Sequence, residues 1–285
     1  MTDEQTGTLY VVATPIGNRG DLAPRALTVL RDAAAIVAED TRQVQRLMSG
    51  AGEPSGQRVS LNAHNEAGRI PGLLERLATG EDLALVSDAG APAVSDPGGR
   101  LVEAAHGAGI PVRTIPGPSA VTALLAVAGL PADRFVFEGF LPTKEQARQE
   151  RIRQLARSPD TTVLFESPRR LALLLAALAE ACGPEREAVV GRELTKHFED
   201  VRRGPLGELA EHYAAAEDEQ RGELVLAVRG SPVDEEEAPP VDADTVLASL
   251  LEELPPSRAA RVAARITNVS RKSLYERALA WRGAD

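Results

Sequence analysis

The stretch LALVSDAGAPAVSDPGG, residues 83–99, decides the fold of this chain. Its first four residues form an apolar run that is typical of a buried strand. In the turn-rich segment that follows, Pro92 and Pro97 lack backbone donors and stiffen the chain. Ser95 and Asp96 directly before Pro97 predict that a helix begins there. A strand, a rigid loop and a helix in this order form the unit of an α/β protein, where ligands bind beyond the carboxyl ends of strands. An ordinary strand-to-helix connection explains the same residues equally well.

Composition sets the bounds of the interpretation. The 285 residues are enough for two domains, and with 43% hydrophobic but only 3% aromatic residues the core is expected to be aliphatic. A net charge of −10 argues against wholesale coating of nucleic acid, but it permits a local basic patch. Cys182 is the only cysteine, so a disulfide within the chain and a cysteine-based metal site are excluded. The four histidines lack the spacing of metal ligands, and no metal site is expected.

The chain is expected to be cytoplasmic and without a membrane partner. Its first seven residues, MTDEQTG, are polar and acidic, unlike a signal peptide. The most apolar run, residues 171–179, is too short to span a bilayer.

Strands alternate with helices up to residue 130, which is the pattern of parallel βαβ units. Asp21 is expected to cap a helix over residues 22–31. After residue 130 the expected strands include 188–192, 198–203 and 223–228, at a short spacing that indicates a mixed sheet with a hairpin. We therefore predict two α/β domains with a cofactor cleft between them and a small helical C-terminal segment. The predicted organisation is an N-terminal α/β domain 1–130, a second α/β domain 131–230, an acidic linker 231–244 and a helical basic segment 245–285.

The C-terminal segment differs in charge from the rest of the chain. Between Arg258 and Arg282 there are seven basic residues and one acidic residue. Apolar residues at helical spacing predict two short helices joined near residues 267–268, an arrangement that resembles a helix-turn-helix. A solvated, arginine-rich helical tail is the alternative.

Turn-rich loops follow the expected strands of both domains. Neither a P-loop signature nor a strict GxGxxG motif is present. What remains is a set of motifs spread over residues 8–230 with a consistent relation to the strands: TPIGN, AEDTR, HNE, SDAGAPAVSDPG, PGPSA, GFLP, FESPRR and RELTK. Together they resemble the tetrapyrrole methylase superfamily of S-adenosylmethionine-dependent methyltransferases. Within it the chain is most similar to the bacterial small-subunit ribosomal RNA cytidine 2′-O-methyltransferases, whose C-terminal end the segment SRKSLYERAL, 270–279, also resembles.

The chain departs from the pattern of that family at two positions. Ala91 stands where the family usually has Thr, so a hydroxyl is missing from the central loop. Gly20 interrupts the apolar character that usually follows Asn18.

The resemblance implies that S-adenosylmethionine binds in the cleft between the two domains, mainly through backbone groups. A carboxylate such as Asp88 favours the positively charged sulfonium, and the helix that begins after Ser119 offers backbone amides to the cofactor's carboxylate, although Ser119 is also a plain helix cap. The cofactor-binding residues implied by the resemblance are Pro15, Ile16, Ser87, Asp88, Ala91, Ser119, Ala120, Phe165 and Glu166.

The implied reaction is the attack of a ribose 2′-oxygen on the cofactor methyl group without a metal, accelerated by alignment. A hydroxyl is a poor nucleophile, so a base or a cationic stabiliser is expected. The catalytic candidates are Asp40, Glu39 and Glu166, with His64 and Glu66 as further candidates for the base. A local ion pair of Glu39 with Arg42 and a helix cap at residues 64–66 explain the same side chains structurally.

The implied partner is ribosomal RNA or the small ribosomal subunit, and the family favours a homodimer. The candidate RNA-binding residues are Arg42, His64, Lys144, Arg148, Arg151, Arg169, Lys196, Arg271 and Lys272. Two alternatives stay open. One is a small-molecule, tetrapyrrole-type methylase, which needs no basic tail, and the other is a non-catalytic protein that binds S-adenosylmethionine or RNA.

Overall fold

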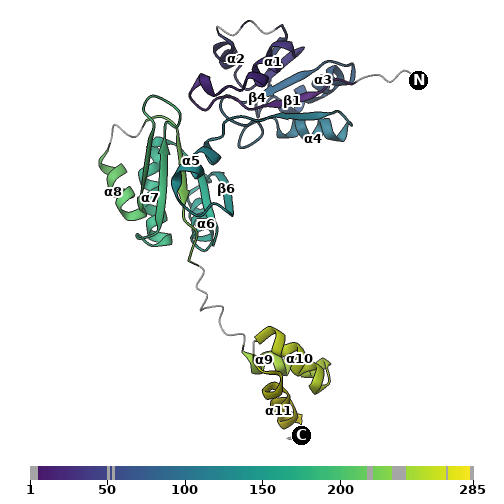
Figure 1. The fold of residues 1–285 in the computed structure, drawn as a ribbon, viewed down its shortest axis with the longest axis vertical. Helices are drawn as coiled ribbons and strands as arrows, with labels where there is room; N and C mark the ends of the chain where they lie inside the picture. Colours follow the sequence, from purple (N-terminus) through teal and green to yellow (C-terminus); the bar gives the residue numbers. More distant parts are fainter. Residues whose placement is uncertain are drawn as a thin grey trace, which may run out of the picture. The chain divides into compact units, whose positions relative to one another are not determined.

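The computed structural model describes residues 6–49, 52, 55–216, 221–232, 242–267 and 269–282. The chain divides into two compact units, Met1–Ser231 and Pro232–Asp285. The first unit contains two five-stranded sheets with helices packed on them, and the second unit is helical (Figure 1). The predicted fold class, two α/β domains followed by a helical C-terminal segment, is therefore confirmed.

The first sheet is entirely parallel, with strand order β3-β2-β4-β1-β5. Two of its three inner strands, β2 and β4 with the sequences AIVA and LALV, are buried at every residue, as apolar runs covered on both faces must be. The strands are β1 (Leu9–Val12), β2 (Ala35–Ala38), β3 (Gln57–Ser60), β4 (Leu83–Val86) and β5 (Val112–Ile115).

Helices cover both faces of this sheet. Buried residues of α1 and α2 pack on one face and those of α3 and α4 on the other. These elements are η1 (Arg19–Asp21), α1 (Pro24–Asp32), α2 (Thr41–Met48), α3 (Glu66–Ala78) and α4 (Gly99–Gly107). Because α1 follows β1 and α4 follows β4, the connections after these neighbouring strands leave toward opposite faces. A crevice opens between strand ends at such a point, which is where open α/β sheets bind ligands.

The second sheet is mixed, with strand order β6-β7-β10-β8-β9. β6 and β7 are parallel and the remaining pairs are antiparallel, and β8 and β9 form the predicted hairpin. Helices α6, α7 and α8 pack on one face around a leucine-rich core. The elements are β6 (Phe135–Phe140), α6 (Glu145–Ala156), β7 (Thr161–Glu166), α7 (Pro168–Cys182), β8 (Glu187–Arg192), β9 (Asp200–Pro205), α8 (Leu206–Ala215) and β10 (Leu224–Val228).

Helix α5 (Ala120–Ala128) joins the two sheets. It follows β5 of the first sheet, yet it packs on the second sheet against β10 (Figure 1). Its buried Val121 and Leu124 share a core with Val189 and Val225 of the second sheet and with Ile16 from the loop after β1. The helix is apolar nearly all round, although Ala126 and Val127 on its outer side are exposed.

The second unit consists of α9 (Ala243–Glu253), α10 (Pro256–Thr267) and α11 (Arg271–Arg282). Its own small core contains Leu247 of α9, Ala259 and Ala263 of α10, and Leu274 of α11. The two helices expected within residues 258–282 are α10 and α11, and α9, which was not predicted separately, precedes them. Most of the predicted acidic linker lies outside the described residues.

Three predicted element boundaries were wrong. Helix α4 begins at Gly99 and not at Pro97, so Asp96 does not cap it. Helix α1 begins at Pro24, and Asp21 lies in the preceding 3-10 helix instead of capping α1. Strand β9 begins at Asp200, two residues later than expected. Within the described part of the chain, no helix combines the length and apolarity needed to cross a membrane.

Candidate active site

The loops after β1 and β4 are bonded to each other at the crevice. Thr14 N donates to Gly90 O at 2.8 Å and Gly90 N donates to Thr14 O at 3.1 Å, which makes a short antiparallel bridge. The buried Thr14 Oγ1 also donates to Ser87 O at 3.1 Å. Ser87 Oγ lies 3.2 Å from Ala89 O and 3.1 Å from Gly90 O. These hydroxyls fix the start of the β4 loop, and they do so with a methyl group at Ala91 in place of the family's hydroxyl.

The far end of the β4 loop is fixed by a buried acid. Glu66 at the start of α3 is 6% exposed, and its Oε1 accepts from Gly98 N at 3.1 Å. Gly98 has φ +113°, and a Cβ there would lie 2.7 Å from Leu85 Cδ2, so only glycine fits. Ala93 and Ser95 have φ angles of 67° and 62°. Non-glycine residues keep this costly conformation where the surroundings hold them, commonly at functional sites.

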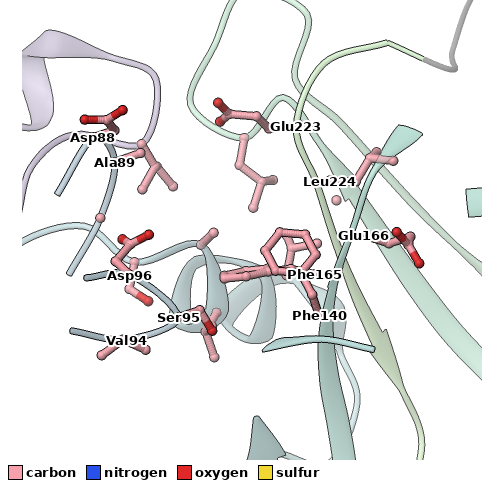
Figure 2. A pocket seen from close by; sticks show the side chains of 18 of the residues that line it. Asp88, Ala89, Val94, Ser95, Asp96, Phe140, Phe165, Glu166, Glu223 and Leu224 are labelled. Carbon is pink, nitrogen blue, oxygen red and sulfur yellow. The ribbon is translucent and has the colours of Figure 1, made fainter. Parts of the chain in front are cut away.

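A cavity of about 420 Å³ opens between this loop, the N-terminus of α5 and the second sheet (Figure 2). We call it the first cavity. Its volume lies in the range of small-molecule sites. Much of its wall is apolar, including Phe165 on β7, whose ring centroid is 5.6 Å from that of Phe140 on β6. The lining residues are Ile16, Asp88, Ala89, Gly90, Ala91, Val94, Ser95, Asp96, Ser119, Ala120, Val121, Phe140, Phe165, Glu166, Ser167, Pro168, Gly191, Leu194, Gly222, Glu223, Leu224 and Val225.

The polar side of the first cavity is acidic. Asp88 and Asp96 come from the β4 loop and Glu223 from the residue before β10 (Figure 2). Among the described residues that line the cavity there is no Lys or Arg. Burial, and then the nearby charges of Glu39 and Asp88, raise the pKa of Asp96 from 3.8 to about 6. The cavity therefore favours a ligand that carries positive charge.

Glu166 also lines the first cavity, but its carboxylate belongs to a different environment. Successive side chains of a strand point to opposite faces, and Figure 2 shows the Glu166 carboxylate directed away from the Phe165 ring. Its Oε2 lies 3.7 Å from Arg148 Nη2 of α6, and its Oε1 lies 3.5 Å from Arg170 Nε of α7. The buried acid thus joins two helices to the sheet.

A second cavity of about 250 Å³ adjoins the first. The two share Ile16, Asp88, Ala89 and Glu223 as a common wall. Unlike the first cavity, the second is lined by three cations, Arg19, Arg46 and Lys196. The other residues that line it are Thr14, Pro15, Gly17, Ala38, Asp40, Gln43, Val44, Leu47, Val86 and Ser87.

Lys196 connects the second sheet to the β1 loop. Its Nζ lies 2.8 Å from Glu193 Oε1 and 3.1 Å from Glu223 Oε2. Loss of solvation alone would lower the pKa of Lys196, but the hydrogen bonds to these two glutamates outweigh it and raise the pKa above its usual value. A Cβ at Gly17 would lie 2.4 Å from Lys196 Cγ, so the loop passes directly beneath this side chain.

Seven of the nine predicted cofactor residues lie together on the first cavity, and the other two, Pro15 and Ser87, line the second. Ser119 stands at the N-cap position of α5, but its side chain makes no capping hydrogen bond. Its proposed cofactor role stays a prediction, as do those of the other eight.

The three predicted catalytic acids lie in three different settings. Asp40 caps α2, and Arg42 binds it through Nε at 2.9 Å and Nη2 at 2.7 Å. Hydrogen bonds from Arg42 lower the pKa of Asp40 to about 2. Such a carboxylate is a weak base. Glu166 is held by arginines, and Glu39 is exposed at the end of β2 beside Asp96. The ion pair expected for Glu39 and Arg42 is made by Asp40 instead.

The candidate RNA-binding residues do not form one surface. The prediction for Arg148 needs correction, because this side chain is 8% exposed and turned toward Glu166. Arg151 forms an ion pair with Glu138 of β6, and Lys196 lies in the second cavity. The exposed members are Arg42, His64, Lys144, Arg169, Arg271 and Lys272, the last two on α11 of the second unit.

Sequence reasoning missed four side chains that line the cavities. Asp96 was interpreted as a helix cap, and Glu223 follows no motif that marks it. Arg19 and Arg46 were not selected, although Arg46 lies one helical turn from Arg42 and that spacing was a usable signal.

The two sheets, the bridging helix and the acidic cleft between them define a two-lobed α/β fold. A crystal structure of the methyltransferase CobJ has this fold, with a TM-score of 0.60 and 23% identity over 79% of this chain and 95% of that one. So does uroporphyrin-III C-methyl transferase from Thermus thermophilus complexed with S-adenyl homocysteine, with a TM-score of 0.53 and 20% identity over 78% and 96% of the two chains.

The particular family follows from the sequence matches. Residues 8–210 match the tetrapyrrole (corrin/porphyrin) methylases, and residues 237–282 match the RsmI C-terminal HTH domain. The ribosomal RNA small subunit methyltransferase I of Xylella fastidiosa is 49% identical over 94% of this chain and 98% of its own length. The chain belongs to the tetrapyrrole methylase family, on the branch that carries the RsmI C-terminal domain, and it is an S-adenosylmethionine-dependent methyltransferase.

Proposed function

We propose that this enzyme methylates the 2′-hydroxyl of a cytidine ribose in small-subunit ribosomal RNA. The observation that carries the proposal is the pair of adjoining cavities, one acidic and apolar and one lined by cations, which share a wall at the crevice of the first sheet. A cofactor cavity with a neighbour that holds cations would not be expected for every methylase substrate, but it suits a phosphate-bearing one. The name of the Xylella fastidiosa relative supports ribosomal RNA as that substrate.

The residues of the first cavity fit S-adenosylmethionine. When bound, this cofactor supplies a methyl group made electrophilic by a positively charged sulfur. Asp88, Asp96 and Glu223 provide the negative environment that such a charge prefers. Phe165, Ile16 and other apolar side chains offer surface for a nucleoside. The backbone amides that begin α5 after Ser119 are suited to a carboxylate.

The chain's own contribution is mainly alignment. The β4 loop is fixed at both ends, by the Thr14–Gly90 bridge and by Glu66, so its side chains meet a ligand already in place. Holding two reactants in the correct relative orientation lowers the activation barrier by roughly 7–11 kcal/mol in favourable cases. Apolar side chains on the cavity wall exclude water from the place of transfer.

The domain boundaries, the location and the assembly are part of the same proposal. We propose α/β domains 1–130 and 131–230, a linker 231–244, a helical segment 245–285, and a cytoplasmic homodimer. Large apolar side chains exposed on the first unit, such as Phe198 (69%) and Leu173 (70%), support a self-association surface. Sedimentation equilibrium at micromolar concentration tests this, and a single species of monomer mass would contradict the dimer.

The function itself is tested by methyl transfer to unmethylated small ribosomal subunits and to the naked RNA, followed by nucleoside mass spectrometry. We expect label in 2′-O-methylcytidine. Label on a base atom would overturn the 2′-O assignment. Binding of S-adenosylmethionine with no labelled nucleoside from either substrate would favour the non-catalytic alternative.

A further inference from the structure

We propose that the second cavity binds an RNA phosphodiester next to the acceptor ribose, with Arg46 as the cation that contacts it. This inference rests on the proposed function, because it assigns the place at which the RNA backbone enters that site. It concerns two arginines, Arg19 and Arg46, that no motif in the sequence marks.

The first argument is the exposed guanidinium of Arg46, whose charge acts on Asp40 only at a distance. Arg42 and Arg46 are one turn apart on α2, and Asp40 neutralises Arg42 through paired hydrogen bonds. Arg46 has only a long contact of 3.5 Å from Nη1 to Gln43 Oε1, a neutral group. Among the described residues no carboxylate forms an ion pair with it, although it lines a cavity. An exposed guanidinium with free donors is well suited to phosphate.

The second argument is the way Arg19 is held. Its Nη2 donates to Leu47 O at 3.3 Å and to Ser49 O, both at the C-terminal end of α2. These carbonyls fix the guanidinium without cancelling its formal charge. The turn that carries Arg19 is itself ordered, because Asn18 Oδ1 accepts from Gly20 N at 2.9 Å and Asn18 N donates to Thr195 Oγ1 at 3.1 Å. Arg19 is therefore a pre-positioned second cation on the same cavity.

The third argument is the contrast with Lys196. This lysine is paired with Glu193 and Glu223, so its charge is already balanced within the protein. The second cavity is lined by as many acids, Asp40, Asp88 and Glu223, as cations, but its two arginines have no carboxylate partner among the described ion pairs. With a phosphate bound by these arginines, the attached ribose would lie at the common wall. Asp88 and Glu223 of this wall also line the first cavity.

The test uses the full chain saturated with S-adenosylhomocysteine, which cannot transfer a methyl group. Binding of a fluorescein-labelled single-stranded oligoribonucleotide is measured by anisotropy as KCl is raised from about 50 to 200 mM. Arg46→Gln is compared with the wild type and with Arg69→Gln, a matched control because Arg69 is an exposed arginine on α3, which covers the other face of the first sheet. One lost phosphate contact makes the slope of log affinity against log salt less steep by about 0.7, and we expect about tenfold weaker binding at the lowest salt.

The result distinguishes this inference from the proposed function. A slope and affinity for Arg46→Gln equal to those of the wild type, or an equal change in Arg69→Gln, would overturn the site even if ribosomal RNA is methylated. Weaker binding of S-adenosylhomocysteine to Arg46→Gln, measured by calorimetry, would assign the arginine to the cofactor and also overturn it. If Arg46 governs oligonucleotide binding but no nucleoside is methylated, the site stands and the proposed function fails.

Inorganic phosphate added at constant ionic strength identifies the group that is bound. We expect phosphate to displace the oligonucleotide from the wild type and to have a weaker effect on Arg46→Gln. Equal displacement from both proteins would contradict a phosphate contact at Arg46.

Discussion

The two cavities of the first unit lie side by side and share four residues, yet among the described residues only the second is lined by cations. The first is lined by Asp88, Asp96 and Glu223 without a described cation, and the second by Arg19, Arg46 and Lys196. The difference comes from a few side chains: Arg19 after β1 and Arg46 on α2 line only the second cavity, whereas Asp96 in the β4 loop lines only the first.

The common wall explains how the two characters coexist. Asp88 accepts a hydrogen bond from Asp40 N at 3.2 Å on the α2 side, and Glu223 binds Lys196 on the other side. The acids of the wall therefore face cations or amide donors in the second cavity and remain available to a cation in the first. A reaction between a cationic donor and a phosphate-bearing acceptor needs such a boundary at the place where the two meet.

The largest expected effect comes from a substitution that fills the first cavity and leaves the second unchanged. Ala120, the first residue of α5, lines only the first cavity, and Ala120→Phe places a ring in the space for the cofactor. We expect cofactor affinity to fall about a hundredfold, equivalent to about 3 kcal/mol, while oligonucleotide binding stays within about twofold. Calorimetry and anisotropy measure the two affinities on the same preparation.

Ala126→Phe is the matched control for that variant, since Ala126 is an exposed residue of the same helix that does not line the cavity. Equal losses of cofactor affinity in both variants would mean that the substitution disturbs α5 and not the cavity. Loss of RNA binding in Ala120→Phe alone would show that the two cavities are one site.

The second expected effect is a difference in salt dependence between RNA binding and cofactor binding. RNA binding through about four phosphate contacts should weaken about fiftyfold when salt rises fourfold, because counterions are released on binding. Cofactor binding in the partly enclosed first cavity should change by less than about twofold. Equal salt slopes for the two ligands would remove the distinction between the cavities.

Much of this arrangement could be predicted from the sequence. The apolar runs at β2 and β4 and the turn residues after them indicated parallel βαβ units. These predictions succeed because strand periodicity and glycine- or proline-rich turns are local signals. The family resemblance, and not the local pattern, singled out Asp88, Ser119 and Phe165, which line the first cavity.

The rest depends on contacts that local pattern does not contain. Arg148 and Glu166 are 18 positions apart, and only the packing of α6 on β7 shows that the arginine is buried. Asp96 was assigned to a helix end because Pro97 is a common first helical residue, but left-handed Ser95 and Gly98 delay α4 to Gly99. Pairing across the fold likewise decides which of the cations, Lys196 or Arg46, keeps an unbalanced charge.

The third effect is a pH dependence confined to the first cavity. The pKa of Asp96 is raised to about 6 in the ligand-free protein, so below pH 6 its carboxyl is mostly protonated. A cationic ligand favours the ionised form and must displace that proton. We expect cofactor affinity to rise about tenfold from pH 5 to pH 7 and then to level off.

Calorimetry in two buffers of different ionisation enthalpy counts the released proton. Asp96→Asn should lose the pH dependence, whereas Asp32→Asn, which replaces an exposed acid at the end of α1, should keep it. A pH profile that is unchanged in Asp96→Asn would assign the titration to another group.

The smallest effect concerns the cost of the acidic cavity to the ligand-free fold. Because the folded pKa of Asp96 lies above the ordinary 3.8, its stabilising contribution is complete below pH 4 and is lost as pH rises through 6. After allowance for its partial exposure, we expect Asp96→Asn to raise the free energy of unfolding of the first unit by about 1 kcal/mol at pH 8, with a smaller gain at pH 5. Urea unfolding followed by circular dichroism measures this free energy.

Fluorescence of Trp281, the only tryptophan, reports on α11 of the second unit, and its unfolding midpoint should not shift. A lower stability of Asp96→Asn at pH 8 would mean that the carboxylate is favourably bound, and that the acidity of the first cavity places no strain on the protein before its ligand arrives.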